Sequence, residues 1–255
     1  IYMCLMVPRM DVHVTDRVNP SLAPATVANV PLGLALMASF TSQAGDYLTR
    51  SSELVFGLPD DLNYSKNGMI YGARLLEATR GLRISDPEFA ANWRGAAAAG
   101  VPRGAYHFYY WCRPAIEQAR WFIRNVPKSA GALPPVLDME WTPFSPTCTI
   151  RPPAEQVRAE ALVFLRMLEA HYGTRPLIYS TPDFFERNGM DRLGDYEFWL
   201  RSTAGHPSRT YPGHRWTFWQ YTGTGLAPGF FTDVDLNVFN GSEAQFRSWL
   251  ARRSQ

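Results

Sequence analysis

The feature that most constrains the fold is a regular alternation of strand-like and helix-like segments from about residue 69 to the end of the chain. Short apolar runs typical of buried strands alternate with longer stretches in which apolar residues recur with the period of a helix. This alternation is typical of a parallel sheet whose strands are joined by crossover helices. A chain of 255 residues also has the usual length of a (β/α) barrel domain. The sequence therefore predicts an α/β fold, a (β/α) TIM-like barrel.

The boundaries of several predicted elements are marked by Pro, Gly or a capping pattern. Pro87 is expected to begin a helix that Gly100 ends, and Ser242 fits a capping box in which Gln245 reaches back to the helix start. The predicted strands cover residues 69–76, 101–110, 136–140, 176–180, 197–201, 215–221 and 233–238, and the other helices begin at 114, after 153 and near 182–187.

An acidic pair closes the predicted strand at 136–140, which follows Pro134 and Pro135. Residues two apart on a strand point to the same face, so Asp138 and Glu140 are expected side by side, with Cα atoms roughly 6.5–7 Å apart. Paired carboxylates in an apolar setting tend to differ in pKa, which suits one as an acid and the other as a stabiliser. Glycoside hydrolysis needs this chemistry. The alternative is a buried acidic pair held by neighbouring donors.

Other polar and aromatic residues also fall near predicted strand ends, where barrel enzymes carry their chemistry. His107 alone is more typical of a hydrogen-bonded core histidine than of a catalyst. Asp233 and Asp235 repeat the two-residue spacing of an acidic pair, and no further spaced acids complete a calcium loop. The set expected at one rim is Tyr106, His107, Phe108, Asp138, Glu140, Tyr179, Trp199, Trp219, Gln220, Tyr221 and Asp235.

Composition narrows the classes of partner. Hydrophobic residues make up 46% of the chain and aromatic residues 14%, which suits a packed core and argues against disorder. The formal net charge is only +2, whereas nucleic-acid-binding proteins typically carry a strong positive charge. No cofactor is implied, because carboxylates alone can cleave a glycosidic bond.

The three cysteines form no pattern typical of a zinc site. Cys112 and Cys148 follow two strands that are expected to be neighbours, so a disulfide between them is predicted for an oxidising compartment. The alternative is two unrelated thiols. Cys4 has no predicted partner.

The N-terminal part differs from the rest. Residues 30–40 form a short apolar run followed by small residues, as in a signal peptide, and the run is too short to span a membrane. The alternative is a buried helix or strand. We expect residues 1–45 to be an N-terminal extension with a signal-like run, and residues 46–255 to be the glycosidase barrel domain. A secreted or periplasmic location follows from this interpretation and from the cysteine pair.

An ordered set of short motifs resembles glycoside hydrolase family 25, the Chalaropsis-type lysozymes. The motifs are Gly104-Ala105-Tyr106-His107-Phe108, Pro135-Val136-Leu137-Asp138-Met139-Glu140, Leu177-Ile178-Tyr179-Ser180, Phe198-Trp199-Leu200, Trp219-Gln220-Tyr221 and Val234-Asp235-Leu236-Asn237. The resemblance runs over about residues 84–250.

The resemblance implies an irregular (β/α) TIM-like barrel. It also implies an N-acetylmuramidase that cleaves peptidoglycan between N-acetylmuramic acid and N-acetylglucosamine. Glu140 matches the general acid of the family, and Asp138 and Asp235 match its other active-site carboxylates. Net retention would use the N-acetyl group of the substrate, oriented or stabilised by Asp138. Tyr106, Tyr179, Trp219 and Gln220 match positions suited to sugar contact.

The first third of the chain departs from the family pattern. The family begins its barrel with a strand that carries Asp-Val-Ser, and no such strand is evident here. A Lys-Ala-Thr-Glu-Gly strand end appears instead as Glu77-Ala78-Thr79-Arg80-Gly81, with both charges reversed.

Three functions therefore compete. The first is a secreted muramidase that acts as a monomer on peptidoglycan strands, with no nucleic acid and no membrane span. The second is a catalytically weak or inactive peptidoglycan-binding barrel that lacks the first-strand Asp. The third is another glycosidase, such as a chitinase-like barrel, whose longer Asp-rich strand motif is absent from the sequence.

Overall fold

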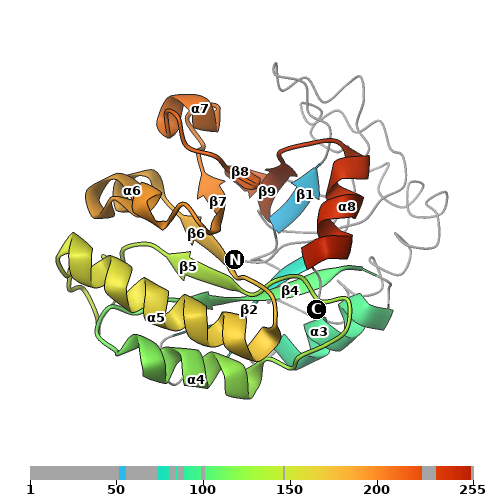
Figure 1. Ribbon diagram of the computed structural model, residues 1–255, viewed down its shortest axis with the longest axis horizontal. Helices are drawn as coiled ribbons and strands as arrows, with labels where there is room; N and C mark the ends of the chain where they lie inside the picture. The colour runs from blue at the N-terminus through green and yellow to red at the C-terminus, as the bar shows by residue number, and fades with distance from the viewer. Residues whose placement is uncertain are drawn as a thin grey trace.

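A computed structural model describes residues 52–55, 74–80, 84–85, 89–98, 101–145, 147–225 and 234–253 (Figure 1). The predictions for the N-terminal segment 1–45 and for Cys4 lie outside these residues. Among the helices that are described, none is long and apolar enough to cross a membrane.

The chain has a mixed α/β fold built on one curled sheet of nine strands, in the order β1-β9-β8-β7-β6-β5-β4-β2-β3. Strands β2 and β4 to β8 run parallel, whereas β9 is antiparallel to β8 and β1 is parallel to β9. The strands are β1 Ser52–Val55, β2 Arg74–Arg80, β3 Ile84–Ser85, β4 Arg103–Phe108, β5 Val136–Met139, β6 Leu177–Ser180, β7 Glu197–Arg201, β8 Phe218–Gly225 and β9 Val234–Phe239.

Two features of the sheet differ from the sequence prediction. The strand β1 was not predicted, yet it pairs with β9 and approaches β2, so it stands near both ends of the curl. The expectation of a parallel sheet was wrong for β9, which pairs antiparallel with β8, and for β3, which was not predicted and pairs antiparallel with β2. Strand β2 shares only residues 74–76 with the strand predicted at 69–76.

Most helices flank the outside of the curl, whereas the last one, α8, closes its inside (Figure 1). The longest, α5, begins after Pro153 and ends at Gly173, whose φ of 75° is a left-handed conformation that favours glycine. The helical segments are α3 Phe89–Ala98, α4 Ala115–Asn125, α5 Ala154–Tyr172, α6 Pro182–Asn188, the 3₁₀ helix η2 Met190–Leu193, α7 Pro207–Thr210 and α8 Glu243–Arg253. Of these, η2 and α7 were not predicted.

The larger apolar core lies between the sheet and α4, α5 and α6. Leu137 and Met139 of β5 and Ile178 of β6 belong to it, together with Phe122 and Phe164 from the helices. His107 is fully buried in this layer, where its Nε2 atom lies 3.0 Å from Gln118 Oε1 and its ring stacks on Phe164. His107 is therefore the core histidine that the sequence predicted.

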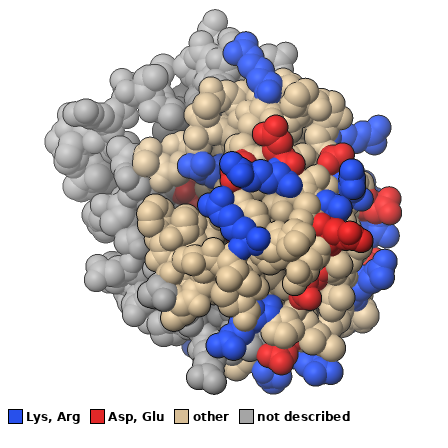
Figure 2. All heavy atoms as spheres, turned by 90° about the vertical axis from the view of Figure 1, so that its left-hand side faces the viewer, with Lys and Arg blue, Asp and Glu red and all other residues tan. Residues whose placement is uncertain are grey.

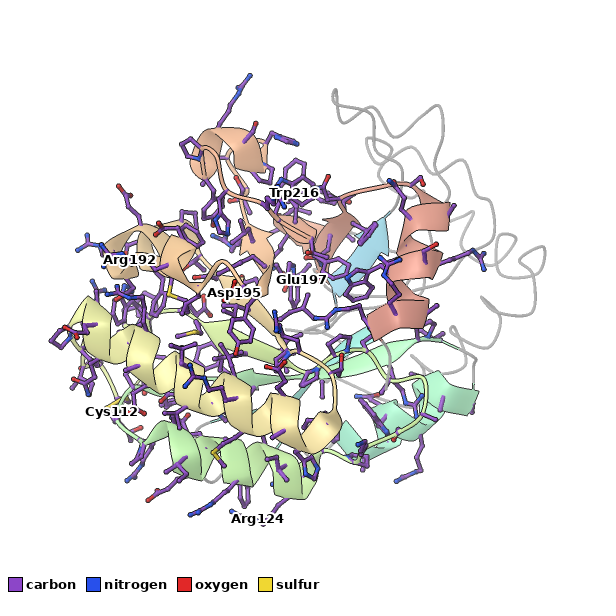
Figure 3. All side chains as sticks on the ribbon, viewed as in Figure 1. Cys112, Arg124, Arg192, Asp195, Glu197 and Trp216 are labelled. Carbon is purple, nitrogen blue, oxygen red and sulfur yellow. A yellow bond between two sulfur atoms is a disulfide. The ribbon has the colours of Figure 1, made fainter. Side chains whose placement is uncertain are left out.

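A second core fills the inside of the curl and is closed by α8. Phe246 and Trp249 of α8 pack against Phe218 and Phe239. Figure 3 places Glu197, the first residue of β7, near this helix, where its carboxylate accepts from Trp249 Nε1 at 2.7 Å. Helix α8 thus covers the end of the curl where the parallel strands begin and leaves the opposite rim to the site.

The predicted capping box of α8 is confirmed. Ser242 N donates to Gln245 Oε1 at 2.7 Å, and Gln245 N donates to Ser242 Oγ at 3.3 Å.

Charges are intermingled on the surface. On the face shown in Figure 2, which is the left-hand side of Figure 1, basic and acidic side chains lie next to one another. This pattern agrees with the small net charge of the chain.

Candidate active site

Strand β5 carries two of the predicted carboxylates to one rim of the sheet. The strand is buried along its whole length between β4 and β6, and Glu140 follows its last residue. Because side chains alternate along a strand, Val136, Asp138 and Glu140 share the face that lines the inside of the curl. Asp138 is 3% exposed, whereas Glu140 is half-buried. One carboxylate is therefore enclosed and the other borders the open rim.

Asp235 lies at the same rim, although its strand, β9, runs antiparallel to β8. It lies at the start of β9, beside the end of β8, because the two strands are antiparallel. A Cβ atom added at Gly223 of β8 would lie 3.2 Å from Asp235 Oδ1, so the β8 backbone passes close to this carboxylate. The sequence placed Asp235 near a strand end. The structure instead puts it at the beginning of a returning strand, at the same rim as Glu140.

The buried hydroxyl of Tyr179 lies within electrostatic reach of all three carboxylates. Burial raises the pKa of Tyr179 well above its ordinary value, and the negative charges of Glu140, Asp138 and Asp235 raise it further, in that order. The positive charge of Arg201 acts in the opposite direction. The hydroxyl stays protonated and donates to Gln220 Oε1 at 2.6 Å.

Hydrogen bonds beneath the rim hold Asp235 in place. Trp199 Nε1 donates to Asn237 Oδ1 at 2.7 Å, and Asn237 Nδ2 donates to the backbone oxygen of Asp235 at 3.2 Å. Trp199 also packs edge-on against Tyr179, with ring centroids 4.8 Å apart. Neighbouring strands are thus tied together directly below the acidic cluster.

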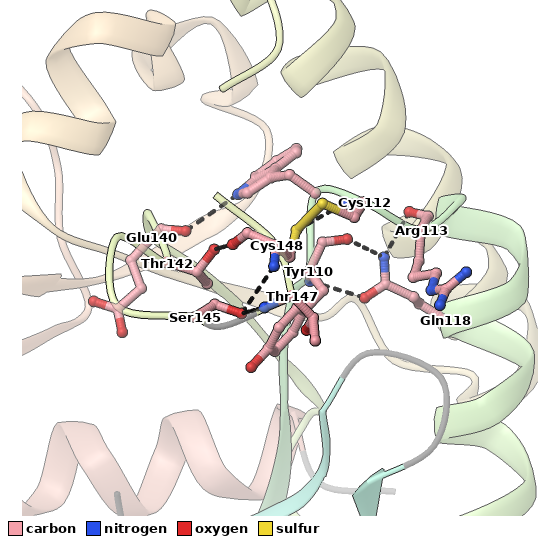
Figure 4. Close-up of a disulfide and its surroundings, with 10 residues drawn as sticks. Tyr110, Cys112, Arg113, Gln118, Glu140, Thr142, Ser145, Thr147 and Cys148 are labelled. Carbon is pink, nitrogen blue, oxygen red and sulfur yellow. Dashed lines mark hydrogen bonds between the residues drawn. A yellow bond between two sulfur atoms is a disulfide. The ribbon is translucent and has the colours of Figure 1, made fainter. Parts of the chain in front are cut away.

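The backbone of Glu140 is held by the loop that follows β4. Trp111 Nε1 donates to the Glu140 carbonyl oxygen at 3.1 Å (Figure 4). The indole of Trp111 stacks on Phe184 at 5.4 Å and lies 6.0 Å from Trp141. Trp111 therefore fixes the carbonyl of the residue that carries the candidate acid.

A disulfide strengthens the same contact. Cys112 and Cys148 are bonded, with Cα atoms 5.6 Å apart, so the predicted disulfide is confirmed (Figure 4). The loop from Thr142 to Cys148 is tightened by Thr142 Oγ1, which donates to Cys148 O at 2.5 Å, and by Ser145 Oγ, which accepts from Cys148 N at 3.1 Å. We call Trp111 and the Cys112–Cys148 disulfide the rim clamp.

The predicted sugar-contacting residues do not all share one face. Tyr106 on β4 lies in the inner core opposite Val136, and Tyr179 and Gln220 face inward beneath the carboxylates. Trp219 precedes Gln220 and therefore lies on the other face of β8. Its Nε1 atom donates to Ser202 O at 2.8 Å, and its ring packs against His206 and against Trp216, which Figure 3 labels.

The first strand carries no carboxylate at the register position of Asp235. Ser52 is the register partner of Asp235, and Glu53 is the partner of Leu236. No first-strand Asp was evident from the sequence, and the pairing of β1 with β9 identifies which residues hold these positions instead.

Sequence reasoning missed two residues of the site. Arg201 ends β7 on the same face as Glu197 and Trp199, and the two-residue alternation in this strand would have placed it at the rim. Trp111 directly precedes Cys112, and no sequence pattern indicates its role. That role comes from a tertiary contact, the hydrogen bond from Trp111 Nε1 to the Glu140 carbonyl oxygen.

The sequence model of the family described as "Glycosyl hydrolases family 25" matches residues 61–230. The chain belongs to glycosyl hydrolase family 25. The match to family 25 includes Asp138, Glu140 and Tyr179, ends five residues before Asp235, and begins after β1.

Solved family 25 structures and curated relatives agree with this membership. A family 25 glycosyl hydrolase from Bacillus anthracis superposes with a TM-score of 0.61 at 36% identity, over 68% of this chain and 80% of that chain. A lysozyme from Streptomyces coelicolor gives 0.62 at 30% identity, over 70% and 85% of the two chains. Lysozyme M1 of Streptomyces globisporus is 34% identical over 184 residues, which cover 67% of this chain and 60% of that protein.

An uncharacterized protein, YegX of Escherichia coli K12, is 32% identical over 187 residues, which cover 72% of this chain and 65% of YegX. The chain thus spans less than two thirds of the length of these curated relatives.

The N-terminal part of the chain is similar to a second, unrelated family model. The model of the N-terminal region of TraG-like proteins matches residues 1–95 and overlaps the family 25 match. Protein TraG of Escherichia coli K12 is 40% identical over 62 residues, which are 24% of this chain and 7% of TraG.

Proposed function

We propose that this chain is an N-acetylmuramidase that hydrolyses the β-1,4 link between N-acetylmuramic acid and N-acetylglucosamine in peptidoglycan. The observation that carries the proposal is the gathering of Asp138, Glu140 and Asp235 around Tyr179 at one rim. Family 25 membership and the lysozymes among the relatives support the choice of substrate.

In the proposed reaction Glu140 is the general acid. Its half-buried position at the open rim gives it access to a substrate, and Trp111 holds its backbone. Glu140 donates its proton to the glycosidic oxygen while the N-acetyl oxygen of the muramyl residue attacks the anomeric carbon. The leaving sugar departs as an alcohol. Water then opens the cyclic intermediate and gives a proton back to Glu140, so the configuration is retained.

The two aspartates have different tasks in this reaction. The enclosed carboxylate of Asp138 lies beside Glu140 and orients and stabilises the N-acetyl group as it becomes positively charged. Asp235, at the start of β9, positions the substrate or water. Tyr106, Tyr179 and Gln220 are the proposed sugar contacts. Trp219 is not among them, because it packs on the outer face of β8.

The second candidate is a barrel that binds peptidoglycan without cutting it. The observation that favours it is that the register partner of Asp235 on β1 is a serine, Ser52.

Further features are proposed on the same basis. The approach of β1 to β2 supports closure of the sheet into an irregular TIM-like barrel. The disulfide supports a secreted or periplasmic location. We keep residues 1–45 as an extension and 46–255 as the glycosidase domain, although the TraG-like match crosses residue 45. We also propose that the protein acts as a monomer.

Analysis of the sugar ends tests the proposed function. Purified peptidoglycan is incubated with the protein, the new reducing ends are reduced with borohydride, and the resulting sugar alcohols are identified after acid hydrolysis. We expect muramicitol. New glucosaminitol ends would contradict the assignment, and wall binding without any new ends would favour the second candidate.

A further inference from the structure

Arg201 is a cation at the acidic rim. It is the last residue of β7, it is half-buried, and its register partner is Gln220, which accepts from Tyr179. Residues two apart share a strand face, so Arg201 lies on the inner face with Trp199, one step closer to the rim. Arg201 thus borders the space above Tyr179, which the carboxylates of β5 and β9 also border.

The guanidinium of Arg201 has no partner within the described part of the chain. Outside the backbone ladder of the sheet, the residue takes part in one hydrogen bond there, in which its backbone oxygen accepts from Tyr211 Oη at 2.6 Å, and its side chain forms no ion pair. The charge of Arg201 nevertheless acts on the Tyr179 hydroxyl together with those of Glu140, Asp138 and Asp235. The cation is therefore close to the acidic cluster without being held in a salt bridge.

The negative charge of the rim indicates what the Arg201 guanidinium could do, which is to bind an anionic group of the ligand. Three carboxylates repel an anionic ligand, and this repulsion is strong where water is largely excluded. Every muramyl residue bears a lactyl ether that either ends in a carboxylate or carries a stem peptide with carboxylates of its own. The planar guanidinium matches a carboxylate with two parallel hydrogen bonds, which a lysine cannot reproduce.

We propose that Arg201 binds the carboxylate borne on the 3-O substituent of the muramyl residue and so selects muramyl over plain N-acetylglucosamine residues at the cleavage site. This inference rests on the proposed function. The carboxylate has two possible sources, the free lactyl group and the stem peptide, and the experiment distinguishes them.

Three soluble glycan preparations test the proposal. The first retains its stem peptides, the second has lost them to an N-acetylmuramoyl-L-alanine amidase and carries free lactyl carboxylates, and the third is the second with those carboxylates converted to neutral methylamides. The values of kcat and KM are measured for the wild type, Arg201→Gln and Arg201→Lys. Arg209→Gln is the matched control, because Arg209 is exposed on α7.

We expect the wild type to cleave at least one of the anionic preparations with a kcat/KM about tenfold or more above that for the methylamide, mostly through KM. Preference for the second preparation identifies the lactyl carboxylate, and preference for the first alone identifies the stem peptide. Arg201→Gln should abolish the preference, Arg201→Lys should retain part of it, and Arg209→Gln should match the wild type.

Two results would overturn the inference while the proposed function stands. One is equal wild-type kcat/KM on all three preparations. The other is a loss in Arg201→Gln that is as large on the methylamide as on the anionic strands, which would make Arg201 a partner of the enzyme carboxylates only. A wild type that cleaves none of the preparations would overturn the proposed function and this inference with it.

Discussion

Single residues of the rim have separable tasks, and Asp138 is the most enclosed of the three acids. We expect Asp138→Asn to lower kcat by roughly 10²–10³-fold, as does the loss of other preorganised stabilising groups. Removal of its negative charge also makes Glu140 easier to ionise. Since Glu140 must be protonated to act, the alkaline limb of the rate profile should move to lower pH.

The matched variant for this test is Asp235→Asn, for which we expect a smaller fall in kcat because its proposed task is placement. Both are measured by release of reducing sugar across a pH series. An Asp138→Asn enzyme with wild-type kcat, or with an unmoved alkaline limb, would show that Asp138 does not act beside Glu140.

Tyr179 should contribute structure and contact without titrating in the working range, because burial and three carboxylates raise its pKa. Tyr179→Phe leaves Gln220 Oε1 without its donor at 2.6 Å, which should cost about 1–3 kcal/mol of unfolding free energy in urea titrations. The pH limits of activity should stay where they are. The expectation would be refuted if the activity of the wild type fell near pH 9–10 and this fall were absent from Tyr179→Phe.

At the scale of elements, the rim clamp couples the β4 loop to the loop that carries Glu140. Reduction of the disulfide, or replacement of both cysteines by Ser, should lower the unfolding free energy by roughly 3–4 kcal/mol, given the separation of 36 residues. Activity should fall as well, because the loop from Thr142 to Cys148 is released.

Trp111→Phe separates the two effects of the clamp. It keeps a ring against Phe184 and Trp141 but removes the donor to the Glu140 carbonyl, so kcat should fall several-fold with little change in KM. Trp121→Phe on α4 is the control for loss of an indole away from the rim. If Trp111→Phe and Trp121→Phe have the same kcat, the clamp has no role in positioning Glu140.

A half-buried histidine that packs against α6 and β7 makes stability depend on pH. The ring of His214 lies 4.7 Å from those of Phe185 and Phe198, and burial lowers its pKa, although Asp191 opposes this in part. The unfolded chain binds the proton near pH 6.5 and the folded chain only at lower pH. Stability should therefore fall as pH drops below about 6.5.

Melting temperatures between pH 7.5 and 5 test this expectation. His214→Phe keeps an aromatic ring and removes the titration, so its melting temperature should decline less steeply than that of the wild type. Because His214 is half-buried, the effect is only part of the total decline. Parallel curves for the two proteins would exclude His214 as the source.

For the molecule as a whole, the sequence predicted the segments whose patterns are local. The strands and α-helices from β4 to β7 agree with the predicted ranges within a few residues, because each strand has an apolar centre and each α-helix begins at a Pro or directly after one. The 3₁₀ helix η2 has no such signal and was not predicted. Strand β1 could not be found this way, because its four residues are defined by pairing with β9. The antiparallel return of β9 likewise depends on the connection and not on the strand itself.

The site was predictable to a similar extent. The spacing of Asp138 and Glu140 indicated a shared face, and alternation could also have separated Trp219 from Gln220, since neighbouring residues of a strand point to opposite sides. The support given by Trp111 could not be read from the sequence, because it comes from a contact between loops 29 residues apart.

The central claim is that this molecule cleaves peptidoglycan by proton donation from Glu140, and one comparison tests it most directly. Wild-type protein and Glu140→Gln, both shown to be folded by circular dichroism, are assayed for release of reducing muramyl ends from purified cell walls. General acid catalysis typically contributes 10²–10⁴-fold, so we expect a loss of that order in kcat with wall binding retained. A Glu140→Gln protein as active as the wild type would contradict the account.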